Sequence, residues 1–183
     1  MRIISGRLGG RNLKTVEGEG YRPAMGKTRE ALFSMLESRS VFSDELRVLD
    51  LFAGSGSLAF EAISRGAPHA LLVENSVQAM RCLQANVEAL GVQAETGLIK
   101  DDVLKVLRRP PQQPYNLVFM DPPYRKKLAE PALRLLAAHR WLTPGAFVTA
   151  EIEKEASFAI PSGFTLETDR LLGQTRVCIW IAP

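Results

Sequence analysis

Residues 48–59 read VLDLFAGSGSLA, an apolar run that turns through two closely spaced glycines into a helical pattern. Glycine suits such a turn because a side chain would block the approach of a ligand to the backbone, and because the turn can require a positive φ angle. Gly54, Gly56 and Ala59 also satisfy the loose G-x-G-x-x-G/A pattern of dinucleotide-binding proteins. The turn therefore predicts a ligand-binding loop without identifying the ligand.

On both sides of this turn, short apolar runs alternate with helical stretches. A parallel sheet covered on both faces is expected, because strands that alternate with helices imply right-handed crossovers. The predicted strands are 48–52, 71–73, 97–99, 117–120 and 147–152, and the predicted helices lie at 28–36 and near 57–65, 76–90, 103–109 and 128–139.

The last part of the chain has a different pattern. Residues 164–167 and 176–181 flank a short polar linker with Gly173, which predicts an antiparallel hairpin that closes one edge of the sheet. The fold expected is therefore α/β and Rossmann-like, with a mostly parallel seven-stranded sheet and a C-terminal antiparallel hairpin.

Length and composition narrow the class of protein. A chain of 183 residues that is 46% hydrophobic fits a single domain, 1–183, with one sizeable core. No stretch approaches the roughly 18 apolar residues of a membrane span, and the N-terminus lacks the apolar block of a signal peptide. Cys82 and Cys178 have neither the number nor the spacing of a disulfide framework or metal site. We expect a cytoplasmic protein without a metal.

Positive charge is concentrated at the N-terminus. Residues 1–29 hold seven basic and two acidic residues, a net charge of +5, which leaves −2 on the remainder of a chain whose total is +3. Such a concentration favours a polyanionic partner, because neutralised phosphates release condensed counterions. We expect residues 1–29 to form a basic RNA-binding arm on a core of residues 30–183, and the arm is made flexible by Gly6, Gly9, Gly10, Gly18 and Gly20.

Acidic residues follow two predicted strands. Glu74 comes directly after 71–73 and 20 residues beyond Gly54, where a carboxylate can accept hydrogen bonds from both hydroxyls of a ribose. The alternative is an acid that helps to start the next helix. Asp102, or less favourably Asp101, could accept from an adenine amino group, although capping of a helix explains an aspartate there almost as well.

The motif Asp121-Pro122-Pro123-Tyr124 follows the buried run 117–120 and favours one chemistry. The exocyclic amine of a base is a poor nucleophile, because its lone pair is delocalised into the ring. The Asp121 carboxylate and the Pro122 carbonyl can each accept one N–H of that amine and turn its lone pair toward a methyl donor. The prolines restrict the backbone that holds these acceptors, and Tyr124 offers a surface on which a base can stack.

This combination favours methyl transfer from S-adenosylmethionine to an amino nitrogen of a nucleic-acid base. Three other classes remain open. A DNA amino-methyltransferase would share the site but usually needs a target-recognition insertion, for which 183 residues leave little room. A nicotinamide-dependent oxidoreductase would share the glycine loop and Glu74, and a non-catalytic RNA-binding module would need only the arm.

The order of motifs resembles that of the RsmD-type 16S ribosomal RNA guanine-N2 methyltransferases over nearly the whole chain. Within that family the last position of the catalytic motif is Phe or Tyr, and the usual Arg-Pro-Thr followed by an acidic residue is replaced here by Ala24 and Gly26. The segments that carry the resemblance are RIISG at 2–6, LGGR at 8–11, RPA at 22–24, REALF at 29–33, DLFAGSGSL at 50–58, EAISRGA at 61–67 and DPPY at 121–124.

The resemblance implies methylation of a guanine N2 amine in 16S rRNA, either naked or in the assembling small subunit, and a monomer is expected. The predicted catalytic residues are Asp121, Pro122, Pro123 and Tyr124. The predicted cofactor-binding residues are Asp50, Phe52, Ala53, Gly54, Gly56, Glu74, Asn75, Asp102 and Val103. The predicted RNA-binding residues are Arg2, Arg7, Arg11, Arg22, Arg125, Lys126 and Lys127.

Overall fold

The computed structural model describes residues 1–16, 26–156 and 159–183. In this part of the chain seven strands form one sheet in the order β3-β2-β1-β4-β5-β7-β6. Strands β1 to β5 are parallel, and β7 runs antiparallel between β5 and β6. The bounds are β1 (Arg47–Leu51), β2 (His69–Glu74), β3 (Thr96–Lys100), β4 (Tyr115–Met120), β5 (Leu142–Glu153), β6 (Thr165–Leu172) and β7 (Thr175–Ile181).

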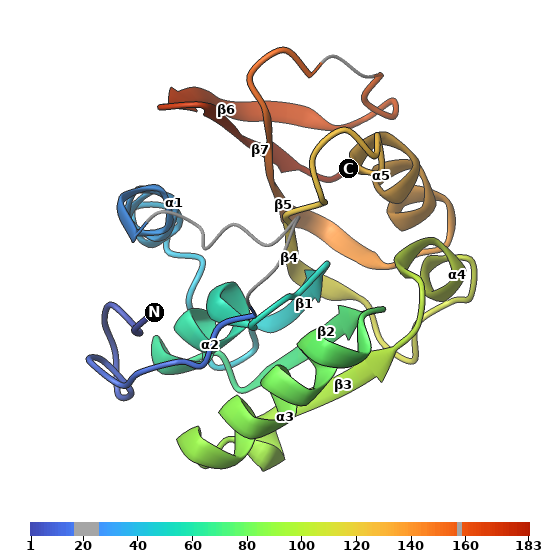
Figure 1. Cartoon of the computed structure of the whole chain (residues 1–183). Coiled ribbons are helices and arrows are strands. Elements are labelled where there is room, and N and C mark those ends of the chain that lie inside the picture. The colour runs from blue at the N-terminus through green and yellow to red at the C-terminus, as the bar shows by residue number, and fades with distance from the viewer. Residues whose placement is uncertain (17–25, 157–158) are drawn as a thin grey trace.

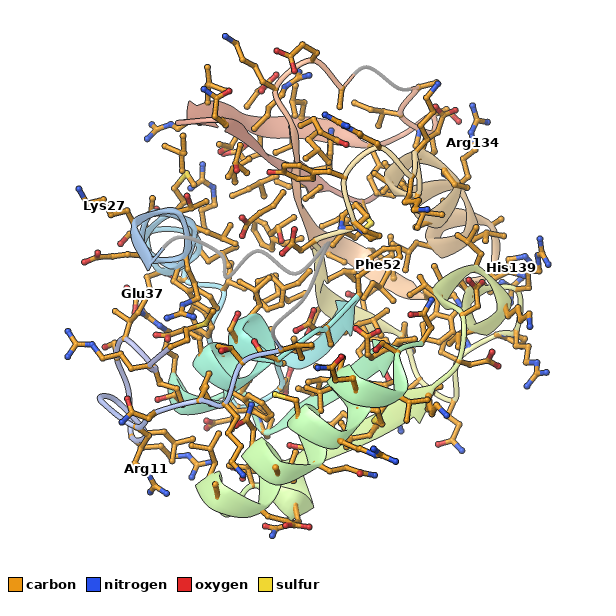
Figure 2. All side chains as sticks on the ribbon, in the orientation of Figure 1. Arg11, Lys27, Glu37, Phe52, Arg134 and His139 are labelled. Atoms are coloured by element: carbon orange, nitrogen blue, oxygen red, sulfur yellow. The ribbon has the colours of Figure 1, made fainter. Side chains whose placement is uncertain are left out.

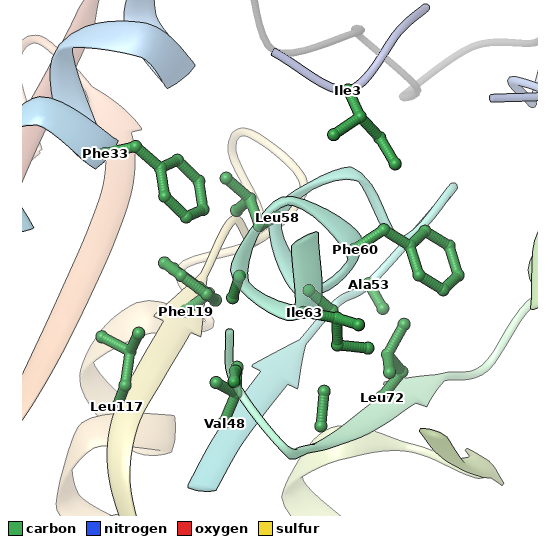
Figure 3. Packing of buried hydrophobic residues seen from close by; sticks show 14 of the residues in the cluster. Ile3, Phe33, Val48, Ala53, Leu58, Phe60, Ile63, Leu72, Leu117 and Phe119 are labelled. Carbon is green, nitrogen blue, oxygen red and sulfur yellow. The ribbon is translucent and has the colours of Figure 1, made fainter. Parts of the chain in front are cut away.

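Helices cover both faces of the sheet, as Figure 1 shows. Those of one face pack with the arm into one hydrophobic cluster, where Phe33 of α1 meets Phe119 of β4 with ring centroids 5.6 Å apart (Figure 3). A second cluster lies under α4 and α5 on the opposite face. The helices are α1 (Gly26–Glu37), α2 (Ser57–Ser64), α3 (Val77–Leu90), α4 (Val103–Leu107) and α5 (Ala129–Ala138), with a 3-10 turn η1 (Gln93–Glu95).

These elements confirm the predicted fold and its C-terminal hairpin, and β5 and β6 differ most in length from the prediction. Strand β5 begins at Leu142, five residues before the predicted start, because Pro144 and Gly145 interrupt the apolar pattern where the β4–β5 register shifts. Strand β6 extends to Leu172. Its second half is mostly exposed at the edge of the sheet, so its polar side chains look like a loop in the sequence.

The strand order reverses between β1 and β4. These neighbours are paired in parallel, with Asp50 opposite Phe119 and Leu51 opposite Met120. The chain after β1 enters α2 on one face, whereas the chain after β4 leads to α5 on the other. The segments that follow the two strands therefore start side by side at one end of the sheet. We call this the carboxyl end of the sheet.

Residues 1–16 are docked on the core, which differs from the flexible arm expected from the glycine content. Ile3, Leu8 and Leu13 are buried in the cluster shared with α1, α2 and α3. Gly6 has a φ of +80°, and a Cβ there would lie 1.9 Å from the Ser64 carbonyl oxygen. Glycine at this position thus permits close packing on α2.

Glu61 of α2 holds the arm by its backbone. Its carboxylate is fully buried and accepts hydrogen bonds from the amides of Ile4 at 2.7 Å and Ser5 at 3.0 Å. Arg65, one turn further along α2, pairs with the same carboxylate at 2.9 Å. Charge-assisted bonds of this kind are stronger than neutral ones. Glu61 therefore helps to hold the arm in place, and nothing in the sequence around Glu61 predicts this contact.

Replacing Glu61 by alanine should lower the free energy of unfolding by about 3–5 kcal/mol, because it leaves the Arg65 Nε and two backbone amides without their acceptor. Chemical denaturation measures this loss. Glu37→Ala is the matched control, since Glu37 pairs with the same arginine but is half exposed, and it should cost less than about 1 kcal/mol. Similar effects of the two substitutions would contradict the anchoring role of Glu61.

Candidate active site

Strands β2, β1 and β4 bring predicted site residues to the carboxyl end of the sheet, and β5 adds an acid that was not predicted. Strand β1 leads into the glycine loop, residues 52–56, and β4 leads into Asp121-Pro122-Pro123-Tyr124. Glu74 ends β2, and Glu151 lies near the end of β5. The two motifs on which the sequence-based hypothesis depends thus follow adjacent paired strands.

The glycine loop is folded tightly against its own helices. Gly56 has a φ of +79°, and a Cβ there would lie 2.4 Å from the Phe60 ring and 2.7 Å from Leu83. Glycine is therefore required here by internal packing, apart from any ligand. Phe52 also has a positive φ, +64°, and is half-buried near the centre of Figure 2. Strain of this kind in a non-glycine residue is often found at functional sites.

Glu74 fixes the glycine loop to β2. One of its carboxylate oxygens accepts from the Gly54 amide at 2.9 Å, and the other accepts from the Ser76 amide at 2.8 Å. A carboxylate has about four acceptor positions, so two remain for hydroxyl groups of a ligand. Asn75, beside it, is exposed, and Ala53 is buried with its amide bonded to the Val73 carbonyl at 3.0 Å.

Asp102 caps α4, which was the alternative interpretation of this residue. Its carboxylate accepts from the Lys105 amide at 3.0 Å, and the amide of Asp102 itself donates to Asp101 at 2.8 Å. Val103, the first residue of α4, is buried. Capping accounts for the aspartate, while contact with an adenine ring remains a prediction for Asp102 and Val103.

The Asp-Pro-Pro-Tyr motif is held by β5 and by β7 of the C-terminal hairpin. The Tyr124 hydroxyl lies 3.0 Å from the Thr175 hydroxyl of β7, and the Arg125 amide donates to the Glu153 carboxylate of β5. Pro122 is buried and Pro123 exposed. Arg125 and Lys127 have positive φ angles of 65° and 51° and, like Lys126, have exposed side chains. The hairpin thus fixes the tyrosine and presents three basic side chains to solvent.

Three buried or partly buried carboxyl groups at this end of the sheet have pKa values well above the ordinary range. Burial raises the pKa of Asp50 to about 8, with the nearby Asp121 and Glu74 adding to the rise, although a 3.2 Å bond from the Ala59 amide opposes it. Burial raises the pKa of Asp121 to about 7. For Glu151, burial and then Asp121 raise the pKa to about 8, against the Arg29 guanidinium.

This cluster of carboxyl groups discriminates between S-adenosylmethionine and a nicotinamide dinucleotide as the ligand of the glycine loop. A cationic ligand, such as a sulfonium with an ammonium group, would stabilise the ionised forms of these carboxyl groups and lower their pKa values, whereas the diphosphate of a nicotinamide dinucleotide would raise the pKa values further. The residues present therefore fit S-adenosylmethionine and fit a dinucleotide poorly. Within the described residues no group of His, Cys, Asp and Glu is arranged to hold a metal ion, and no helix is long and apolar enough to cross a membrane.

The predicted RNA-binding residues fall into two regions. Arg125, Lys126 and Lys127 lie at the carboxyl end of the sheet, whereas Arg7 pairs with Glu95 and Arg11 donates to the Ala89 carbonyl, near the far end of α3. A helix of 14 residues spans about 21 Å, so Arg7 and Arg11 lie about this far from the start of α3, which is at the carboxyl end of the sheet. Arg2 is exposed, and Arg22 lies outside the described residues, as does Ala24.

Asn86 of α3 connects the arm to the glycine loop. Its side-chain amide donates to the Ser55 carbonyl and the Lys14 carbonyl, both at 3.0 Å, and its oxygen accepts from the Lys14 amide at 2.8 Å. The residue is 1% exposed. The sequence analysis missed Asn86, because a lone asparagine in a helical pattern carries no signal. Lys14 is thereby the arm residue placed beside the loop.

Glu151 was also missed, although the sequence held a sign of it. It is an acid inside the apolar run 147–152, and it lies at the same end of the sheet as the other motifs. Charged residues rarely occupy such buried positions unless they have partners. An acid in a buried strand next to the Asp-Pro-Pro-Tyr strand could have been included as a candidate on this ground.

The strand order, the glycine loop after β1 and the Asp-Pro-Pro-Tyr after β4 define the chain as a Rossmann-like methyltransferase. Among solved structures, that of yhhF from Escherichia coli, described as a candidate methyltransferase, has a TM-score of 0.87 and 32% identity, covering 100% of this chain and 97% of that one. The chain belongs to the family described as Conserved hypothetical protein 95, which it matches over residues 1–181.

Similar curated proteins give the family resemblance a name. "Ribosomal RNA small subunit methyltransferase D" of Haemophilus influenzae is 36% identical over 175 residues, which cover 94% of this chain and 89% of the relative. The protein of the same name from Escherichia coli K12 is 33% identical, with 95% and 86% covered. These matches confirm the resemblance to RsmD-type proteins predicted from the motifs.

The ligand-free protein should lose stability as the pH rises from 6.5 to 8. The pKa values of Asp50 and Glu151, raised to about 8 in the folded protein, lie above their ordinary values near 4 in the unfolded chain. The folded state therefore binds more protons in this window, and the associated stability is lost as the pH rises through the folded values. The free energy of unfolding should fall by up to about 1.4 kcal/mol per pH unit for each group.

Urea denaturation across this range measures the slope. His69 contributes little to this slope. Burial lowers its pKa, and the pH range chosen lies at or above the ordinary pKa of histidine. Asp50→Asn is the matched variant and should flatten the slope, whereas a wild-type stability that is constant or increases with pH would contradict the raised pKa values.

Proposed function

We propose that this methyltransferase transfers the methyl group of S-adenosylmethionine to the N2 amine of a guanine in 16S rRNA. The observation that carries the proposal is the placement of Asp121 and Pro122 directly after β4, which pairs with the strand that leads into the glycine loop. The names of the relatives support small-subunit rRNA as the substrate rather than DNA. The acidity of the site supports a cationic cofactor.

Asp121 and Pro122 activate the amine. The Asp121 carboxylate and the Pro122 carbonyl each accept one N–H of the exocyclic amine, which turns the nitrogen lone pair out of conjugation with the ring. Neither group can donate a proton while Asp121 is ionised. Tyr124, fixed through Thr175, provides a surface for stacking of the base. Direct in-line transfer follows, without a covalent enzyme intermediate.

The glycine loop and its neighbours hold the cofactor, which supplies a methyl group made electrophilic by its sulfonium. Gly54 and Gly56 bring the loop backbone against the methionine end, and Asp50 helps to orient it. Glu74 accepts from the ribose hydroxyls through the acceptor positions that the loop leaves open. Phe52, Ala53, Asn75, Asp102 and Val103 complete this set, with Asp102 or Val103 at the adenine.

The target guanine has to leave a duplex stack, or already lie in a loop, to reach the methyl donor. Arg125, Lys126 and Lys127 are exposed directly after the catalytic motif and contact the phosphates that flank the target. Arg2, Arg7, Arg11 and Arg22 of the arm contact RNA further away. The two regions suit a large folded RNA better than a short single strand.

Asp121→Ala should lower kcat about 10²- to 10³-fold, because one of two acceptors for the amine is lost. Binding of S-adenosylmethionine, measured by titration calorimetry, should remain nearly unchanged. Transfer of radiolabelled methyl to naked rRNA, assembled small subunits and duplex DNA measures turnover and identifies the substrate together. Asp44→Ala, which removes an exposed aspartate before β1, is the control. Equal loss of cofactor binding and turnover would show that Asp121 is structural.

Reversing the charge of Arg7 and Arg11 together should weaken RNA binding more at low than at high salt, with a salt slope reduced by about 2 and kcat unaffected. Both residues lie about a helix length from the reacting groups, so only affinity should change. Filter binding over a salt series measures the slope. Arg134→Glu on α5 is the control, because Figure 2 shows Arg134 on the opposite side of the molecule from Arg11. An unchanged slope would remove the arm from the RNA interface.

A further inference from the structure

Glu151 lies beside Asp121 at the carboxyl end of the sheet. Ala150 of β5 pairs in parallel with Met120 of β4, and Glu151 and Asp121 are the next residue on each chain. Paired residues of neighbouring parallel strands lie about 4.8 Å apart and point to the same face. Continuing this register places the two carboxyl groups side by side. One belongs to Asp121 directly after β4, and the other to Glu151 on the neighbouring strand β5.

The Glu151 side chain has an unsatisfied buried oxygen. The residue is 5% exposed, and its Oε1 has no hydrogen-bond partner within the described part of the chain. Among groups facing it, Val177 of β7 is apolar, Asp50 of β1 is acidic, and Arg29 of α1 is the nearby cation. A buried carboxyl oxygen without a donor is costly for the ionised form, so a proton shared with a neighbour would lower this cost.

Arg29 does not neutralise the site by itself. Its guanidinium donates to the Met1 sulfur and to the Arg2 carbonyl of the arm. Its charge also acts on Glu61, which affects it more strongly than Glu151 does. The charge of Arg29 thus acts on both Glu61 and Glu151, and Glu61 is paired with Arg65 as well. Two adjacent carboxyl groups, one buried and one partly buried, ionise one after the other, so near neutral pH one of them keeps its proton.

We propose that Glu151 shares one proton with Asp121, so that the two carboxyl groups carry a single negative charge when the substrate binds. Glu151 is then a positioning residue, because it acts through Asp121 and does not touch the base. This inference rests on the proposed function for its role in the reaction, and on the fold alone for the pairing of the carboxyl groups.

The shared proton explains how charge and protons balance in the reaction. The bond between the methyl carbon and sulfur breaks as the bond to the guanine N2 forms, so sulfur becomes a neutral thioether and N2 gains a positive charge. Asp121, ionised while the shared proton resides on Glu151, accepts the extra proton of N2. The pair is then neutral and returns a proton to solvent after product release. The presence of Glu151 keeps Asp121 basic enough to accept that proton near neutral pH.

Titration of the ligand-free protein tests the pairing directly, using carbon-13 NMR of labelled Asp and Glu carboxyl groups. In the wild-type protein Asp121 and Glu151 should each report two coupled steps. In Glu151→Gln, Asp121 should titrate in one step, at a pH about one unit or more lower. Glu155→Gln, which neutralises an exposed acid on the same segment, should leave Asp121 unchanged.

Wild-type carboxyl groups that each titrate once near pH 4 would overturn the proposal, and so would an Asp121 that titrates identically with and without Glu151. The wild-type titration decides the question even when the variant fails to fold. In the methylation assay, the rising limb of log kcat against pH should move to lower pH in Glu151→Gln, whereas a merely structural residue would lower kcat equally at every pH. Absence of rRNA methylation by the wild-type protein would contradict the proposed function while leaving the titration result intact.

Discussion

The parallel pairing of β1 with β4 controls the geometry of the whole site. Hydrogen bonds of the sheet fix Leu51 opposite Met120, and the chain leaves these strands toward opposite faces. The starts of the glycine loop and the Asp-Pro-Pro-Tyr motif are consequently held about one strand spacing apart. The remaining elements preserve this register, with α1 to α3 covering one face and the C-terminal hairpin bracing β5.

Charge is arranged in opposite senses inside and outside the site. Asp50, Asp121 and Glu151 make the interior acidic, whereas Arg125 to Lys127 and the arm make the surroundings basic. An interior of this kind suits a small cation, and a basic exterior suits a polyanion. The two ligands of the proposed reaction therefore have complementary places. The same arrangement discourages an anionic dinucleotide in the glycine loop, which the sequence pattern alone permits.

Most of the fold was predictable because its signals are local. Apolar runs located β1 to β4, and the Gly173 turn located the hairpin. The errors have physical causes: Pro144 and Gly145 hide the start of β5, and the exposed edge position of β6 makes its polar side chains resemble a loop. The glycine content of the arm suggested flexibility, but the bonds that Glu61 makes to its backbone are long-range and leave no trace in the local sequence.

The site was predictable to the extent that its residues follow strands directly. Asp50, Glu74 and Asp121 were predicted in this way, and the strand order brings them to one end of the sheet, although their binding and catalytic roles stay predictions. Asp102 illustrates the limit, since the same carboxylate serves as a helix cap in the structure. Asn86 could not be assigned from spacing, because its importance depends on what lies beside the helix, and Glu151 was marked only as an acid inside an apolar run.

The bonds of Asn86 couple two parts of the molecule that meet different ligands. One amide side chain holds the Lys14 backbone of the arm and the Ser55 carbonyl of the glycine loop. Movement of the arm away from α3 breaks the two hydrogen bonds between Asn86 and the Lys14 backbone. The remaining bond, to the Ser55 carbonyl, then depends on a side-chain amide that is free to rotate. Asn86 thus links the segment proposed to contact RNA with the loop proposed to hold the cofactor, so a shift of either one would be felt by the other.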